Sequence, residues 1–318
     1  MDFWLTDDHE ALRDGTRAML ADRFALDDLA TLEPSGRPID ADRWLTLAGT
    51  GVFSLRTDGF GVREAVLVYE ELGRHLVPGP VVATHLASGL VEGASSGDAI
   101  VGLLEPGVEV TVVEHAAQVT HLLWFRGDEL VLIDPGRLAV EALPRPLDAL
   151  SPTARCTTPL DGVGQVIERG AAVVQRHRVG VVLTAALQLG VALGAVELAS
   201  AYAKEREQFG RPIGSFQAVK HLLADMLVAA EVARAAVYAA ACALDGAGDG
   251  GDAARAASTA KVMAGHAALL NGKTGIQVHG GMGFTWEVHA QRYWKRAVVL
   301  DSTFGSSDDH ALAIAGVL

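Results

Sequence analysis

The sequence predicts a mostly α-helical, multidomain α+β protein with three parts. These are an N-terminal helical domain over residues 1–97, a small antiparallel β domain over 98–166, and a C-terminal four-helix bundle over 167–318. In both outer parts apolar residues recur at three- and four-residue intervals, which is typical of helices. Between them the spacing shortens toward two, and short β-branched runs alternate with turn residues, which is typical of strands. A chain of 318 residues is long enough for several domains.

The N-terminal domain has recognisable helix starts. Thr6 or Asp7 can cap a first helix, because both side chains accept hydrogen bonds from free backbone N–H groups. A break at 33–38, rich in proline and glycine, ends this helical region, and Asp40 opens the next helix. Later helices are predicted over residues 64–75 and 81–92.

The middle region is predicted to be a short antiparallel sheet, because its apolar runs are brief and separated by turn residues. The predicted strands cover residues 100–104, 109–114, 120–125, 129–133 and 139–143.

The C-terminal region returns to a helical spacing near Arg169 and keeps it. Four Ala-rich helices follow, which suits close packing in a bundle. The last three of them are predicted over residues 216–244, 253–276 and 286–299, with a glycine-rich link at 245–252.

Composition excludes several classes of function. A net charge of −13 argues against nucleic-acid binding, which needs a basic face. No apolar run reaches the roughly 18 residues that a bilayer span needs, and the first 25 residues lack the pattern of a signal peptide, so we expect a cytoplasmic protein outside the membrane. Cys156 and Cys242 form no C-x-x-C and the histidines show no metal-ligand spacing, so neither a disulfide nor a metal site is expected.

Two motifs in the C-terminal region stand out. The first runs from Tyr202 to Gln217 and contains R-x-x-F-G, formed by Arg206, Phe209 and Gly210. The second is Q-V-H-G-G-M-G-F over residues 277–284, where glycine implies a positive φ or a close backbone approach. It follows a helix rather than a strand, so it is not a Rossmann fingerprint.

Together the two motifs resemble the C-terminal domain of acyl-CoA dehydrogenases, flavoenzymes that form an α,β double bond in a thioester. The resemblance covers most of the chain and includes E-E-L-G-R at 70–74. It implies FAD as cofactor, with the flavin ring in one subunit's β domain and the ADP half on the neighbour's bundle. The matching residues are Arg206, Phe209, Gly210 and Gln217 in the first motif, and Gln277, Gly280, Gly281 and Gly283 in the second.

The resemblance also implies roles for individual residues in this cofactor site. Arg206 would contact the pyrophosphate, for which a guanidinium is well shaped. Gln208, Phe209 and Gln217 would support that end of the cofactor. Gln277 and the backbone at His279, Gly280 and Gly281 would contact the adenosine part. The alternative for Arg206 is a solvated charge beside Glu205 and Glu207.

The two positions that hold the catalytic base in this family carry no acid here. The usual position falls on Phe304 and the second on Gly180, and neither side chain can accept a proton. If the loop is shifted, Asp301 or Asp308 could substitute; otherwise they are solvated or capping residues. The family's flavin-ring segments in the β domain are also missing, with only Glu105-Pro106-Gly107 at the first of them.

These gaps make the chain similar to the degenerate subunit of a heteromeric acyl-CoA dehydrogenase, of the kind paired in actinobacterial steroid degradation. A heterotetramer with a second acyl-CoA dehydrogenase chain, a steroid-derived acyl-CoA substrate and an electron-transfer flavoprotein as acceptor are then expected. Two alternatives remain: a self-sufficient homo-oligomer that uses Asp301 or Asp308, and a non-catalytic scaffold that binds CoA esters or another flavoprotein.

Overall fold

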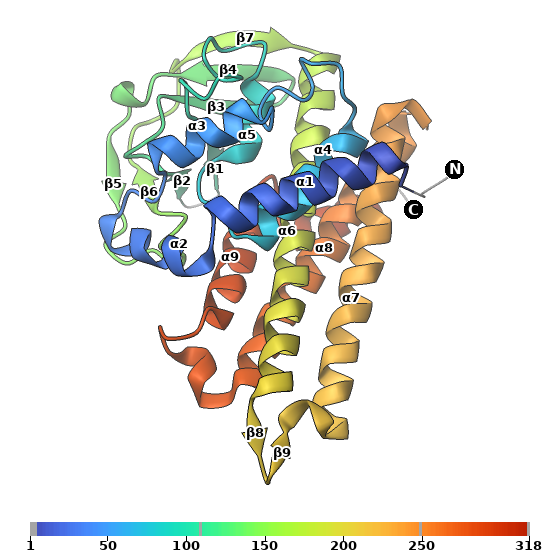
Figure 1. The fold of residues 1–318 in the computed structure, drawn as a ribbon. Helices are drawn as coiled ribbons and strands as arrows, with labels where there is room; N and C mark the ends of the chain where they lie inside the picture. Colours follow the sequence, from blue (N-terminus) through green and yellow to red (C-terminus); the bar gives the residue numbers. More distant parts are fainter. Residues whose placement is uncertain (1–4, 108–109, 248–249, 317–318) are drawn as a thin grey trace. The chain divides into compact units, whose positions relative to one another are not determined.

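The computed structural model describes residues 5–107, 110–247 and 250–316 (Figure 1). Its contacts divide the chain into two units. The helical unit contains Met1–Asp22, Val66–Val77 and Val181–Leu318, and the sheet unit contains Arg23–Ala65 and Pro78–Gly180. The mostly helical α+β class is confirmed, while the division into 1–97, 98–166 and 167–318 stays a prediction.

The N-terminal helices begin near the predicted caps. Thr6 Oγ1 accepts a hydrogen bond from His9 N at 3.3 Å, and Asp40 accepts one from Arg43 N at 3.0 Å. The helix expected over 81–92 is shorter, because Ser88 leaves the helical conformation and Gly89 has φ +80°. The helices are α1 Asp7–Arg23, α2 Leu26–Leu32, α3 Ala41–Gly49, α4 Val62–Arg74 and α5 Val81–Ala87, with a 3₁₀ turn at Glu33–Ser35.

In the described part of the sheet unit, seven strands form one sheet in the order β5-β6-β2-β1-β3-β4-β7. The expectation of a wholly antiparallel sheet is wrong at one pairing, because β1 and β3 run parallel with Val101 opposite His121. β6 and β7 were not predicted, and the predicted start at Glu109 lies outside the described residues. The strands are β1 Val101–Pro106, β2 Thr111–Glu114, β3 His121–Arg126, β4 Glu129–Ile133, β5 Val140–Ala142, β6 Thr153–Cys156 and β7 Gln165–Arg169.

Polar side chains tie helices and loops to this sheet unit. The Thr84 hydroxyl of α5 donates to Val101 O at 3.1 Å and accepts from Val101 N at 3.0 Å. The Gln118 amide bonds both backbone groups of Ile39, at 3.1 and 2.7 Å. Each contact satisfies backbone groups that would otherwise be costly to bury.

The described residues of the C-terminal region form the four predicted helices and a fifth that was not expected, α10. The last predicted helix begins at Ala290 rather than Trp286. The elements are α6 Ala171–Glu205, β8 Glu207–Gln208, β9 Arg211–Pro212, a 3₁₀ turn at Ile213–Ser215, α7 Gln217–Cys242, a π-helical segment Ala243–Ala247, α8 Gly250–His279, a 3₁₀ turn at Gly280–Phe284, α9 Ala290–Ser302 and α10 Ser307–Ala315.

Glycines allow α4 and α6 to approach closely within the helical unit. A Cβ at Gly73 would overlap the backbone of Leu187, and a Cβ at Gly190 would overlap the carbonyl of Glu70. Larger residues at either position would push the two helices apart. The glycine of E-E-L-G-R therefore has a packing role.

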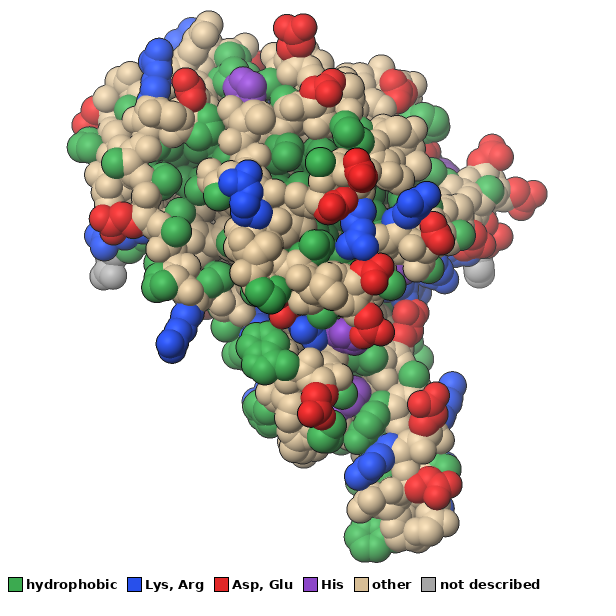
Figure 2. Space-filling view, turned by 60° about the vertical axis from the view of Figure 1, so that its left-hand side comes forward, with side chains coloured by type: hydrophobic (Ala, Val, Ile, Leu, Met, Phe, Trp, Pro, Cys, Tyr) green, Lys and Arg blue, Asp and Glu red, His purple; other side chains and the backbone are tan. Residues whose placement is uncertain are grey.

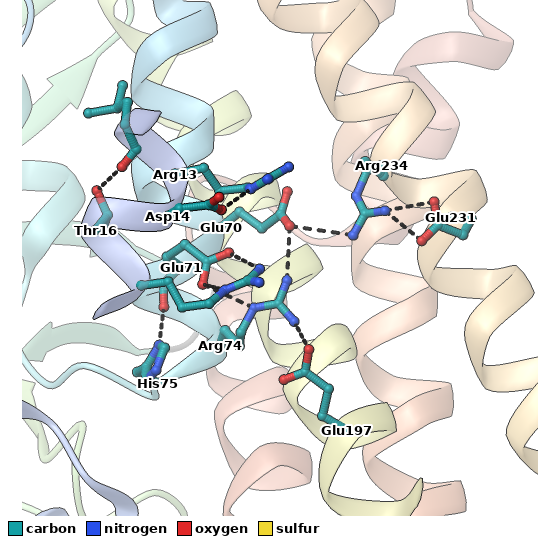
Figure 3. A network of polar contacts seen from close by, with 12 residues as sticks. Arg13, Asp14, Thr16, Glu70, Glu71, Arg74, His75, Glu197, Glu231 and Arg234 are labelled. Atoms are coloured by element: carbon teal, nitrogen blue, oxygen red, sulfur yellow. Dashed lines mark hydrogen bonds and ion pairs between the residues drawn. The ribbon is translucent and has the colours of Figure 1, made fainter. Parts of the chain in front are cut away.

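The acidic and basic residues of the same motif form a buried ion cluster (Figure 3). Glu70 and Glu71 are 2% and 0% exposed, and Arg74 is 6% exposed. Arg74 Nη2 lies 3.1 Å from Glu70 Oε1, its Nε lies 3.1 Å from Glu71 Oε2, and its Nη1 contacts Glu197 on α6. Arg17 of α1 donates two hydrogen bonds to Glu71 at 3.0 and 2.8 Å, which raises the pKa of its guanidinium. Opposite charges and hydrogen bonds together offset the cost of burying these carboxylates.

Among the described residues, two helices are long and apolar enough to cross a bilayer by length and composition alone, so the expectation of no such run is wrong. They are α6 and the helical stretch Gln217–Gly246. The α6 window is fully buried within the chain, whereas that of Gln217–Gly246 is 33% buried. Core helices of soluble proteins pass the same test, so this is weak evidence for a membrane.

Candidate functional site

The first motif forms a hairpin between α6 and α7. β8 and β9 pair antiparallel, with Gln208 opposite Arg211. Phe209 and Gly210 fill the two-residue turn with φ values of +55° and +74°. Two left-handed residues match the twist of a tight hairpin, and glycine takes that conformation without strain.

This hairpin places Phe209 in solvent. Phe209 is 92% exposed, and a hydrophobic side chain marks the tip of the projecting hairpin in Figure 2. At the base of the hairpin, Ile213 N donates to Arg206 O at 2.8 Å. A Cβ at Gly214 would lie 2.8 Å from Ala203 O, so glycine lets the chain pack back against α6.

The second motif ends α8. Gly280 has φ +61°, and its surroundings are open. A Cβ at Gly283 would lie 2.5 Å from Ile276 O, so this glycine permits a close backbone approach. Gly281 needs neither explanation, because its φ is not positive and, apart from the adjacent backbone, no atom of the described residues lies within 4 Å of its Cβ position. Gly281 therefore leaves free space above the backbone.

A ring contact brings the two motifs together. Tyr202 of α6 stacks on His279 of α8 with ring centroids 4.2 Å apart and planes inclined by 24°. Arg206 follows one turn later and donates its backbone N–H to Tyr202 O at 2.8 Å. His279 is 5% exposed and its Nδ1 lies 2.7 Å from Gly275 O. Both motifs thus lie at the hairpin end of the helical unit (Figure 1).

All the predicted cofactor residues are exposed except His279, which is buried. His279 points into the bundle, so its backbone is what remains available. Within the part of the chain that the structure describes, Arg206 has no ion-pair partner. The exposed members are Arg206, Gln208, Phe209, Gln217, Gln277, Gly280 and Gly281.

The chemistry of this surface fits the ADP half of FAD. An unpaired guanidinium suits a pyrophosphate, and an exposed aromatic ring suits the face of an adenine. The open position at Gly281 allows a ligand to reach the backbone.

Two aromatic residues without an assigned role lie at the C-terminal end of the second motif and just beyond it. Phe284 is 78% exposed and Trp286 is 64% exposed. Lys295 Nζ lies 4.1 Å from the centre of the Trp286 ring. Exposed aromatic residues beside cations are typical of binding surfaces. The sequence shows the aromatic residues but gives no sign of the contact from Lys295, which comes from the next helix.

Phe304 occupies a closed loop between α9 and α10. It is 2% exposed and has φ +58°, which is strained for a residue with a side chain. Its carbonyl lies 2.9 Å from His310 Nε2, and His310 Nδ1 lies 3.0 Å from Ser258 Oγ. Burial lowers the pKa of His310. Because a carbonyl oxygen can only accept, Nε2 donates the hydrogen bond to Phe304 O.

The candidate substitutes for the base lie at the two ends of this loop. Asp301 Oδ1 accepts a hydrogen bond from Ser307 Oγ at 2.5 Å. Asp308 is exposed in the first turn of α10, where Ser306 and Asp309 form the capping box instead. Gly180 is buried within α6. Both predicted base positions therefore hold no acid.

Comparison with known proteins supports the same family along the chain. A model of the family described as acyl-CoA dehydrogenase, C-terminal domain, matches residues 169–318. The acyl-CoA dehydrogenase FadE34 of Mycobacterium tuberculosis is 35% identical over 84% of this chain, which spans 41% of that longer relative. The acyl-CoA dehydrogenase IpdE2 of the same organism is 29% identical over 92% of this chain and 91% of its own length.

Solved structures show the same fold over nearly the whole chain. A steroid acyl-CoA dehydrogenase variant, Tcur3481-Tcur3483, matches 98% of this chain and 97% of its own with a TM-score of 0.82 and 26% identity. The ChsE4-ChsE5 complex of M. tuberculosis matches 99% of this chain and 98% of its own with a TM-score of 0.83 and 23% identity. A structure of PigA with FAD and proline also matches, with a TM-score of 0.82, 20% identity and coverage of 100% and 99%. Sequence motifs, fold and relatives agree, and the chain belongs to the acyl-CoA dehydrogenase family.

Proposed function

We propose that this chain is one subunit of a heteromeric, FAD-dependent acyl-CoA dehydrogenase that desaturates an acyl-CoA thioester between Cα and Cβ. Acyl-CoA dehydrogenases use FAD as their cofactor. The observation that carries the proposal is the contrast between two regions of the chain. The cofactor motifs are gathered on an exposed surface, while the usual base position holds the buried Phe304.

In this proposal the chain binds the ADP half of FAD. Arg206 holds the pyrophosphate through its unpaired guanidinium, and Gln208, Phe209 and Gln217 support it from the hairpin and the start of α7. Gln277 and the backbone of residues 279–281 hold the adenosine. Bound flavin supplies the acceptor for the hydride that leaves Cβ.

A partner chain supplies the carboxylate that removes the proton from Cα. Loss of a positioned base costs about 10²–10⁴ in rate, so a chain with Phe304 and Gly180 at the two base positions needs one from elsewhere. Two similar structures support a two-chain assembly and a steroid substrate. One is described as a steroid acyl-CoA dehydrogenase and is named for two chains, Tcur3481 and Tcur3483; the other is a complex of ChsE4 with ChsE5. We therefore propose a heterotetramer that acts on a steroid-derived CoA ester. A cytoplasmic location and an electron-transfer flavoprotein as acceptor complete the proposal.

The test is to replace Arg206 in the co-expressed complex and to measure bound flavin. Because charge-assisted hydrogen bonds contribute about 1.5–3 kcal/mol, Arg206→Ala should weaken flavin binding about 10- to 100-fold. The matched control is Arg255→Ala. It removes an exposed arginine near the start of α8, whereas the second cofactor motif lies at the end of that helix. Equal flavin content in both variants would show that Arg206 does not hold the cofactor.

Expression of the chain alone separates this proposal from its alternatives. A yellow, active protein without any partner would instead favour a self-sufficient enzyme that uses Asp301 or Asp308. A complex that binds CoA esters without flavin would favour a non-catalytic scaffold. The proposal requires flavin and turnover only when both chains are present.

A further inference from the structure

Helix α7 has an apolar side that the described part of the chain leaves uncovered. Its apolar window is only 33% buried, and Leu227, Val228 and Val232 are 47%, 61% and 46% exposed. Ala224 and Ala235, one turn before and two turns after Val228, are exposed as well. Residues at such spacings lie on one side of a helix, so these five side chains form a strip, which we call the α7 face. An exposed apolar strip of this kind is typical of a surface that associates with another molecule.

Charged side chains on and beside the α7 face make a bilayer an unsuitable cover for it. Lys220 and Glu231 lie on the same side of the helix and Asp225 lies at its flank, and all three are exposed. Ionic groups in hydrocarbon are costly because they lose their water. Glu231 also pairs with Arg234 on the same helix, with 2.5 Å between Oε1 and Nη1. Another protein surface can cover the apolar strip and still leave these charges paired or hydrated.

The order of the charges makes the α7 face complementary to itself. Lys220 lies toward the start of the helix, and Glu231 lies about three turns later. In a twofold symmetric pair, the same helix of the second copy runs in the opposite direction. A contact centred midway between these two residues then sets each lysine opposite the glutamate of the other copy. Ala224 and Val228 lie between the two ion pairs, so apolar side chains fill the middle of the contact and charges its ends.

We propose that the α7 face binds a second copy of this chain, in an antiparallel contact between the two α7 helices across a twofold axis. Burial of the apolar strip drives the association, and the Lys220–Glu231 pairs fix its direction and register. A parallel arrangement would instead set lysine beside lysine and glutamate beside glutamate.

The contact assigns separate surfaces to the two kinds of neighbour in a heterotetramer. Two copies of this chain meet through their α7 faces, while the hairpin end of each helical unit remains available for the partner chain. This place within a heterotetramer rests on the proposed function. The contact between the two copies does not, because it needs neither flavin nor the partner chain.

The first test is sedimentation velocity of the chain alone and of the co-expressed complex, each with and without Val228→Glu. The chain alone should sediment as a dimer, and the variant should raise its dissociation constant about 100-fold or more, because symmetry buries the new carboxylate twice. The complex should fall to half its mass and keep its flavin. Val174→Glu, at a valine that is 40% exposed in the first turn of α6, is the matched control and should change neither mass. Circular dichroism checks that both variants keep their helices.

The second test exchanges the two charges of the proposed ion pair. Lys220→Glu alone sets glutamate opposite Glu231, and Glu231→Lys alone sets lysine opposite Lys220, so each should weaken the dimer on the order of 10-fold. The chain that carries both substitutions should dimerise like the wild type, because the pair is restored with its charges exchanged. Restoration within one kind of chain requires that both residues meet across a contact between identical copies.

Three outcomes would overturn the inference. The first is a chain that is monomeric alone and present in one copy in the complex, or a dimer that Val228→Glu leaves intact. The second is a double charge exchange that fails to restore the association lost in the single variants, which would mean that a different chain covers α7. The third is co-sedimentation of the wild type, but not of Val228→Glu, with vesicles of phosphatidylcholine and phosphatidylglycerol, which would identify a lipid surface as the cover. None of these outcomes is read from flavin content, so they are distinguishable from failure of the Arg206 test.

Discussion

The glycines of the second motif differ in what each one does at the end of α8. Gly280 provides a positive φ, Gly283 provides a close approach to Ile276 O, and Gly281 leaves open space. The sequence predicts that glycine is needed in this segment, yet it cannot distinguish these three reasons. They depend on backbone conformation and on which atoms come near, and a run of glycines encodes neither.

This difference gives a paired prediction for Gly283→Ala and Gly281→Ala. The first variant must shift the backbone near Ile276 and should lose about 1–3 kcal/mol of unfolding free energy. The second should fold with near wild-type stability, because nothing lies near its Cβ. If flavin approaches the backbone here, Gly281→Ala should still reduce the flavin content of the complex. Urea denaturation and flavin absorbance measure the two effects, and equal destabilisation of both variants would contradict this assignment.

The lack of an acid at the two expected base positions is a second feature that depends on single residues, Phe304 and Gly180. Alignment of motifs was enough to place Phe304 and Gly180, and the structure finds both buried. The left-handed backbone at Phe304 and its bond to His310 were beyond prediction, because they depend on α10. That helix was missed, and its capping box of Ser306 and Asp309 was the available signal.

At the scale of elements, helices were easier to predict than strand pairing. Asp40 marks the start of α3 through its own side chain, so a local rule is enough. The parallel pairing of β1 with β3 is decided by the path of the chain between them. β6 and β7 were missed because each is short and lies among turn residues. Alternating patterns show that a strand exists but carry no information about its direction or neighbours.

The helix α4 carries an element-scale prediction through its buried ion cluster. Glu71→Gln would leave Arg74 buried, and Arg17 half-buried, beside a neutral amide. Removal of one partner from a buried pair costs about 3–5 kcal/mol, because the remaining charge loses its compensation. Glu231→Gln on α7, where the carboxylate is 48% exposed, is the control and should cost at most about 1 kcal/mol. Guanidinium denaturation compares the two, and equal small losses would show that Glu71 does not hold α1 to α4.

At the scale of the whole molecule, the hairpin end of the helical unit shows more apolar surface than a monomer needs. Phe209, Phe284 and Trp286 are 92%, 78% and 64% exposed; the first two belong to the two cofactor motifs and Trp286 lies just after the second. Scattered exposed apolar residues are ordinary, but aromatic residues grouped around one site indicate a surface that binds a partner. The proposed assembly accounts for this surface, since the partner's flavin domain would cover the same end of the bundle.

This assembly predicts a specific effect of Trp286→Ala. Buried tryptophans at interface centres cost 2 kcal/mol or more on truncation, so the complex of the two chains should dissociate about 30-fold more readily. Leu312→Ala, on the exposed face of α10 where the leucine is 72% exposed, removes a comparable apolar group from the surface and should leave the complex intact. Sedimentation velocity of the co-expressed complex over a dilution series measures the dissociation constant.

Trp286→Ala should also lower the stability of the chain itself modestly, because Lys295 lies over the Trp286 ring. Thermal denaturation of the isolated chain measures this fall in stability separately from the loss of assembly. Unchanged dissociation with Trp286→Ala would show that the partner chain does not bury this ring.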